Sequence, residues 1–107
     1  MTNSQIDAFE AMLRQGRDDA LLRFGLGNAY LKAGDAAQAV THLEAALRHD
    51  PRFSAAYKLL GKALTDCDRI DEALGAYRNG IEAANERGDV QAAKEMSVFA
   101  RRLASKD

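Results

Sequence analysis

Two short segments decide the fold of this chain: Leu26-Gly27-Asn28-Ala29-Tyr30 and, 34 residues later, Leu60-Gly61-Lys62-Ala63-Leu64. When residues 20–53 are aligned with residues 54–87, four positions are identical: Leu26 with Leu60, Gly27 with Gly61, Ala29 with Ala63, and Ala39 with Ala73. Because the chain is rich in alanine, four identities alone are weak evidence for a repeat. The stronger evidence is the position of small and large residues within the two segments.

Small residues recur where two helix backbones would touch: Gly27 and Gly61, Ala39 and Ala73, Ala46 and Gly80. Large apolar residues recur between them: Leu26 and Leu60, Tyr30 and Leu64, Val40 and Leu74, Leu43 and Tyr77, Leu47 and Ile81. A small residue on one helix admits a large residue of its neighbour, which lets the two helices pack closely. The pattern predicts a helical hairpin that occurs twice.

The composition also favours helices. Alanine supplies 21 and leucine 12 of the 107 residues, whereas Val, Ile and Thr together supply only 9. Alanine and leucine are strong helix formers and β-branched residues fill strands, so we expect an all-α fold without a sheet. The length and the 47% apolar content are sufficient for one globular domain with a single core.

Helix signals along the chain predict six helices at about 4–15, 19–33, 36–49, 54–66, 69–85 and after Gly88. Gly16, Gly34, Gly88 and Pro51 lie where helices should end. The expected N-caps are Ser4, in a capping box with Asp7, then Asp18 or Asp19, Asp35, Asp68 and Asp89. The predicted connections between these helices have only two to five residues, so successive helices should be antiparallel neighbours.

The hairpin pattern resembles the tetratricopeptide repeat family, whose 34-residue unit follows a W-x2-L-G-x2-Y, A-x3-F and final P pattern. The first copy matches at Leu26, Gly27, Tyr30, Ala39, Leu43, Ala46 and Pro51, and the second at Tyr57, Leu60, Gly61, Leu64, Ala73, Tyr77 and Gly80. Arg23 stands in the first aromatic position, and Asn85 replaces the second proline. Without that proline, the fifth helix should extend beyond the usual stop. An ordinary antiparallel bundle is the alternative.

The resemblance implies a right-handed superhelical stack with four parts. These are a half-repeat at 1–18, repeats at 19–53 and 54–87, and a closing helix at 88–107. Continuing the register backwards places Ile6, Phe9 and Leu13 at the positions of Val40, Leu43 and Leu47. In the closing helix, Ala92, Met96, Phe99 and Leu103 form one apolar face that a neighbour must cover.

The resemblance also implies a function, because this family binds extended peptides or partner helices in a concave groove. It places on that groove Leu21, Phe24, Asn28, Leu31, Ala55, Lys58, Lys62 and Thr65. We therefore expect a non-catalytic adaptor that binds a protein or peptide, with a monomer favoured over a homodimer. Because no stretch reads as a signal peptide or membrane span, we expect it in the cytoplasm. Phe24 as a core ring and the two lysines as a solvated face are the simpler alternative. Some chaperone adaptors of this family clamp a C-terminal carboxylate, but Phe24 and Leu59 replace the required lysine and asparagine.

A second class of function is self-assembly, in which Leu21 and Phe24, or the remaining apolar surface of the end helices, would be buried against another copy. Nucleic-acid or membrane binding lacks support, because 15 basic and 16 acidic residues are mixed along the chain. A lone Cys67 excludes an internal disulfide, and His42 and His49, seven residues apart, are too distant for one metal.

Two other candidate sites are better explained as helix caps and as helix packing. Asp66, Asp68, Asp71 and Glu72 lack the glycine of a calcium loop, and Gly25 and Gly27 follow no strand as a dinucleotide loop would require. We therefore predict no catalytic group, metal or cofactor.

Overall fold

The structure is a computed structural model that describes residues 3–105. Within this range the chain forms six α-helices: α1 (Ser4–Arg14), α2 (Ala20–Lys32), α3 (Ala36–His49), α4 (Ser54–Asp66), α5 (Ile70–Glu86) and α6 (Val90–Ala104). Residues 3–105 contain no strand, so the all-α prediction is confirmed. Residues 1–2 and 106–107, which the predicted end segments include, lie outside the described part.

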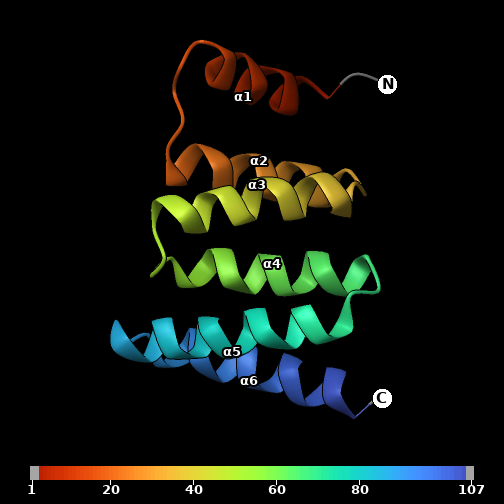
Figure 1. Ribbon diagram of the computed structural model, residues 1–107, viewed down its shortest axis with the longest axis vertical. Helices are drawn as coiled ribbons and strands as arrows, with labels where there is room; N and C mark the ends of the chain where they lie inside the picture. Colours follow the sequence, from red (N-terminus) through yellow and green to blue (C-terminus); the bar gives the residue numbers. More distant parts are fainter. Residues whose placement is uncertain (1–2, 106–107) are drawn as a thin grey trace.

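The helices form an elongated stack of 40 × 29 × 19 Å, with α1 at one end and α5 and α6 at the other (Figure 1). Each helix packs against the next one in the chain, and α4 also contacts α2 and α6. The first helices of the hairpins therefore lie side by side. This arrangement makes α2, α4 and α6 one layer of the stack.

The predicted packing of small against large residues is present in both hairpins. A Cβ atom built on Gly27 would lie 2.5 Å from Leu43, and one built on Gly61 would collide with the ring of Tyr77. A Cβ atom on Gly80 would lie 2.6 Å from Tyr57 and 2.5 Å from the sulfur of Met96. Real Cβ atoms do not approach other atoms so closely, so these glycines determine the helix spacing.

Helix starts follow the expected capping chemistry at three positions. The side chains of Asp19, Asp35 and Asp89 accept hydrogen bonds from the backbone amides of Leu22, Gln38 and Ala92. The predicted capping box of Ser4 and Asp7 is wrong. Asn3 caps α1 instead, because its side-chain oxygen accepts from Gln5 and Ile6 and leaves Ser4 as the first helical residue.

The prediction that Asp68 caps the fifth helix is also wrong. Asp68 has a φ of +60° and ends α4, since its amide donates to Thr65 O and the Arg69 amide donates to Leu64 O. Asp68 occupies the position that Gly34 has one repeat earlier, and Gly34 also has a positive φ of +84°. The short turn needs a left-handed residue there, so Asp68 serves as a helix stop.

The fifth helix is longer than its counterpart, as the missing proline predicted. Helix α5 has 17 residues and α3 has 14. Pro51, in the turn that ends the first repeat, has an exposed ring, and its carbonyl oxygen accepts a hydrogen bond of 2.8 Å from the Tyr57 hydroxyl. The extension of α5 matters for the position of α6, which starts 36 residues after α4 and not 34.

Candidate binding groove

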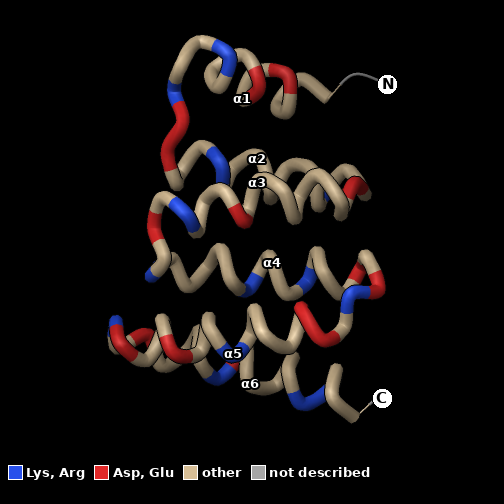
Figure 2. Tube along the Cα trace, viewed as in Figure 1, with Lys and Arg blue, Asp and Glu red and all other residues tan. Residues whose placement is uncertain are grey.

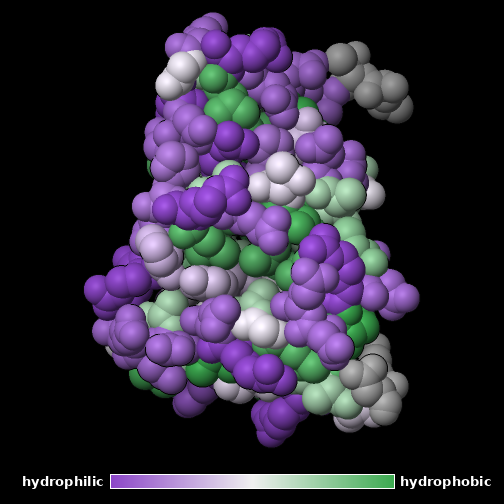
Figure 3. Space-filling view, viewed as in Figure 1, coloured by the Kyte–Doolittle hydropathy of each residue, from purple (hydrophilic) through white to green (hydrophobic). Residues whose placement is uncertain are grey.

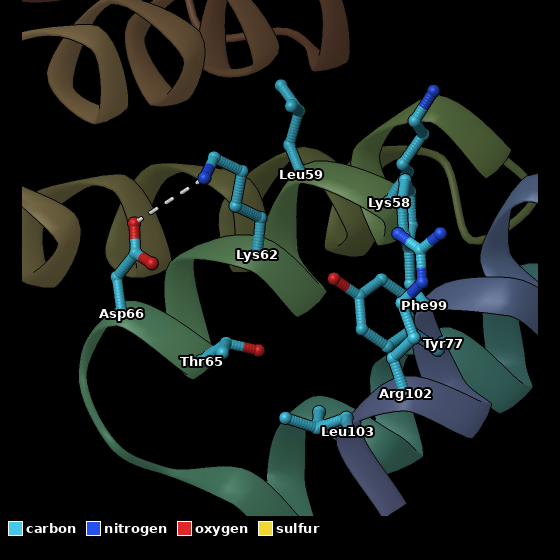
Figure 4. A pocket seen from close by; sticks show the side chains of 9 residues that line it. All are labelled: Lys58, Leu59, Lys62, Thr65, Asp66, Tyr77, Phe99, Arg102 and Leu103. Carbon is cyan, nitrogen blue, oxygen red and sulfur yellow. Dashed lines mark ion pairs between the residues drawn. The ribbon is translucent and has the colours of Figure 1, made fainter.

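A cavity of about 310 Å³ lies between α4 and α6. Its walls are formed by nine side chains: Lys58, Leu59, Lys62, Thr65, Asp66, Tyr77, Phe99, Arg102 and Leu103. Figure 4 shows Lys62, Thr65 and Asp66 on α4, Phe99, Arg102 and Leu103 on α6, and the Tyr77 ring between the two helices. The layer formed by the first helices of the hairpins therefore contains a hollow.

The floor of this cavity is apolar and firmly held. Tyr77 and Leu103 are buried, and the rings of Tyr77 and Phe99 pack with their centroids 5.9 Å apart. Burial raises the pKa of the Tyr77 phenol, while the Thr65 side chain acts in the opposite direction. The floor is thus uncharged at neutral pH and suited to an apolar side chain.

The rim of the cavity carries charge of both signs with an excess of cations. Lys58 donates to Glu95 on α6 over 2.5 Å, and this hydrogen bond holds the pKa of Glu95 below its ordinary value. Lys62 lies 3.9 Å from Asp66, and Arg102 is exposed. The Lys62 side chain is 62% exposed, so its weak pairing leaves it available to another carboxylate.

The structure brings only part of the predicted groove together. Lys58, Lys62 and Thr65 line the cavity, and Ala55 is exposed outside it. The predicted residues of the first repeat lie elsewhere. Leu21 is 67% exposed, and Asn28 is half-buried.

Phe24 and Leu31, two further residues of the predicted groove, are engaged within the chain. The ring of Phe24 stacks on Phe53 with a centroid distance of 4.7 Å, and Leu31 packs against the core. Neither residue lines the cavity between α4 and α6.

Sequence reasoning missed the contributions of α6, namely Phe99, Arg102 and Leu103, as well as Leu59 and Asp66 on α4. It assigned Tyr77 to helix packing alone. The signal for α6 was present in its apolar stripe, which needs a covering neighbour. Phe99 and Leu103 belong to that stripe, and α6 turns them toward α4 and α5, where they also close the cavity.

A separate polar network explains the arginine at the first aromatic position. The Arg23 guanidinium donates to both carboxylate oxygens of Asp18 (2.8 and 2.9 Å) and to Nδ1 of His42 (3.1 Å). This pairing raises the pKa of Arg23, and it lowers the pKa of Asp18, which also contacts His49. Arg23 thus links the α1–α2 connection to α3. At the position of Arg23, the repeat pattern of the family has an aromatic ring.

The same network reaches α1. His42 is buried, its Nε2 lies 3.5 Å from Glu10, and its ring is stacked on Tyr30 at 5.4 Å. The Tyr30 hydroxyl donates to Glu10 over 2.8 Å. Burial, as the largest effect, lowers the pKa of His42. Both histidines therefore have structural partners.

Other residues singled out in the sequence have local roles. Cys67 is the half-buried C-cap of α4, and Glu72 pairs with Arg69 at 2.7 Å. No group of three or more potential ligands for a metal ion occurs among the described residues. Charges of both signs are spread along the stack (Figure 2). Between residues 3 and 105, no helix has the length and apolar character needed to cross a bilayer.

Comparison with known proteins identifies the fold. Two tetratricopeptide repeat profiles match residues 30–96 and 6–40. The TPR repeat-containing protein PA0015 of Pseudomonas aeruginosa is 49% identical over 98 residues, which cover 92% of this chain and 93% of that protein. The solution structure of BPP2914 from Bordetella parapertussis has a TM-score of 0.85 at 44% identity, covering 99% of this chain and 92% of that one.

A third likeness concerns the fold alone. The TPR2B domain of yeast Sti1, solved as a complex with pHsp70, has a TM-score of 0.87 at 19% identity and covers 95% of this chain and 82% of that one. The repeat profile covers residues 30–96, and the 49% identity to PA0015 extends over 92% of this chain. The chain belongs to the tetratricopeptide repeat family.

Proposed function

We propose that this protein is a non-catalytic interaction module that binds a segment of another protein at the cavity between α4 and α6. The observation that carries the proposal is the combination of an apolar floor, made by Tyr77, Phe99 and Leu103, with a cationic rim. An apolar side chain of the bound segment would enter the cavity. A nearby acidic group would meet Lys62 or Arg102.

The surroundings of the cavity support this choice of site. Leu21 and Val90 are the large apolar side chains with high exposure among the described residues, and neither lines the cavity. On the face drawn in Figure 3, hydrophilic side chains divide the apolar surface into small patches. The cavity therefore offers a recessed apolar floor that these small patches do not provide. The Sti1 domain shows that a protein of this fold occurs in complex with a partner.

The test is selection from a library of random peptides displayed on phage, followed by measurement of Kd for the enriched peptides. We expect the enriched sequences to combine a large apolar residue with an acidic one. The double variant Lys62→Glu/Arg102→Glu should weaken their binding at least tenfold. The matched control Lys32→Glu/Arg48→Glu, which reverses two exposed cations elsewhere, should bind as the wild type does.

Equal affinity of both double variants for the selected peptides would rule out this site. Self-assembly through Leu21 is the second candidate function, because this side chain is 67% exposed. Phe24, the other residue expected to take part, already stacks on Phe53 of the same chain. Sedimentation velocity at increasing concentration, with Leu21→Ser as the comparison, separates the two functions.

A further inference from the structure

In the described part of the chain, the last helix, α6, has no second helix with which it could form a hairpin. Helices α5 and α6 form the end of the stack (Figure 1), and a crevice of about 410 Å³ opens between them. We call this crevice the end surface, and its walls are Ile81 and Asn85 of α5 with Val90, Ala93, Lys94, Ser97, Val98 and Arg101 of α6. Val90 is 58% exposed there, which is high for an apolar side chain.

The register of α6 relative to α4 shows which position of a repeat this surface corresponds to. Helix α6 begins 36 residues after α4, so Met96 corresponds to Leu60 and Ser97 to Gly61. Met96 is fully buried and its sulfur lies beside Gly80, as expected of the residue that packs on the preceding helix. Ser97 then occupies the small position that faces the second helix of its own hairpin.

In both complete hairpins, that small position receives a large side chain. Leu43 packs at Gly27, and Tyr77 packs at Gly61. No second helix follows α6 within residues 3–105, and Ser97 is half-buried. The end surface thus has the small residue and the flanking apolar groups of a helix-binding position.

The charge of the end surface defines the chemistry of its occupant. Lys94 and Arg101 stand on its α6 wall, are both exposed, and have no ion-pair partner within 4 Å among the described residues. Other exposed cations, such as Lys32, Arg48 and Arg102, also have no ion pair among the described residues, so it is the position of Lys94 and Arg101 on the crevice wall that favours an acidic occupant. An occupant with acidic side chains beside its apolar stripe would complement both cations.

We propose that the end surface is a docking site for an acidic amphipathic helix of a partner protein, which takes the place of the second helix of a third hairpin. A second copy of this chain is a poorer occupant, because its helices already use their apolar stripes. Ile6 of α1 is buried, and Phe9 lies 3.2 Å from the Cβ position of Gly25 on α2. Docking of α1 onto another copy would require its release from α2.

The chain itself provides a suitable probe, a stapled helical peptide with the sequence of residues 68–87. This segment has five acidic and three basic side chains, and its Tyr77 is the residue that packs at Gly61 in the parent fold. We expect saturable binding of the labelled peptide by fluorescence anisotropy, weakening as salt rises. A peptide with Tyr77→Ala should bind at least tenfold more weakly.

Variants of the protein locate the site. Lys94→Glu/Arg101→Glu should weaken binding of the peptide at least tenfold, while Lys32→Glu/Arg48→Glu should stay within about twofold of wild type. Amide chemical shifts should change around Ser97 and Val98. This mapping excludes exchange of the peptide for α5, which would instead move signals of Gly61 and Leu60.

Absence of saturable binding, or equal affinity for Lys94→Glu/Arg101→Glu and wild type, would overturn the proposal. Self-association of the wild type that disappears in Lys94→Glu/Arg101→Glu would identify a second copy as the occupant and overturn the assignment to a partner protein. Sedimentation velocity without peptide makes that measurement.

Discussion

The ring of Tyr77 fills the space beside Gly61 that a Cβ atom would need. Leu43 fills the same space beside Gly27, and both members of this second pair lie 34 residues earlier in the chain. The repeat in the sequence is therefore a repeat of one contact. The glycine permits two helices to approach, and the large residue of the second helix keeps the interface free of a void.

This contact predicts that Gly61→Ala destabilises the protein despite the higher helix propensity of alanine. The new methyl group would collide with the buried ring of Tyr77, so the ring or the helix would have to shift. Overpacking of this kind costs about 1–3 kcal/mol in the free energy of unfolding. Urea denaturation followed by circular dichroism measures it.

Gly75→Ala is the matched control, since Gly75 also lies within a helix but has no atom within 4 Å of its Cβ position. This change should stabilise the protein by about 0.5–1 kcal/mol. If both substitutions had the same sign, the close approach at Gly61 would not determine the packing of α4 and α5.

Arg23 provides a second prediction, because its side chain is only 18% exposed and contacts both Asp18 and His42. Arg23→Ala removes a charged hydrogen-bond donor from two groups and should cost about 1–3 kcal/mol. Arg17→Ala removes the exposed pair with Asp19 and an exposed hydrogen bond to the sulfur of Met12, and it should cost less than about 1 kcal/mol. Thermal melting of the two variants compares them, and equal loss would mean that the network adds nothing beyond a surface ion pair.

The sequence predicted the contacts that occur in both repeats, but it did not predict those that occur in only one place in the chain. The pairs Gly27–Leu43 and Gly61–Tyr77 could be predicted because one register relates them. Asp68 was assigned to the wrong helix end, although Gly34 at the matching position indicated a stop. A capping aspartate and a left-handed aspartate look alike in sequence, and the geometry of the turn decides between them.

Among the residues that line the cavity between α4 and α6, the predicted groove includes only residues of α4, for a related reason. Phe99 and Leu103 line it from α6, which starts 36 and not 34 residues after α4 because α5 is longer than α3. Phe24 does not line this cavity, and its ring stacks on Phe53, from the turn before α4. Neither event follows from a repeat pattern, since each depends on a segment in which the two copies differ.

The pH dependence of stability should reflect His42. Arg23 donates to Nδ1 of its ring, so the ring is neutral in the fold, and burial lowers the pKa of His42 below that of a free imidazole, about 6.5. The unfolded chain then binds this proton more readily than the folded chain. Stability should be complete above about pH 6.5 and should fall as the pH decreases from there toward the lower pKa of the folded state.

Melting temperatures between pH 7.5 and pH 5 test this prediction, with His42→Gln as the comparison. A glutamine can accept from Arg23 and donate toward Glu10, but it does not titrate, so its pH dependence in this range should be smaller. The carboxyl groups with lowered pKa, such as Asp18 and Glu95, lose their contribution only at more acidic pH. An identical pH dependence of wild type and variant would assign the effect to other groups.

The final prediction concerns the attachment of α6, which forms one wall of the groove and also carries the end surface. Met96 is the fully buried side chain that fixes this helix, and its sulfur fills the space beside Gly80. Met96→Ala should cost about 2–5 kcal/mol because it leaves a cavity between α5 and α6. Leu21→Ala, a similar truncation at a side chain that is 67% exposed, should change stability by less than about 0.5 kcal/mol.

Hydrogen exchange should show faster opening of α6 than of α2 in the Met96 variant, and uniform acceleration across all helices would mean that α6 opens only when the whole chain unfolds. Because Phe99 and Leu103 reach the groove through α6, local opening of this helix would also weaken peptide binding without any change in a residue that lines the cavity.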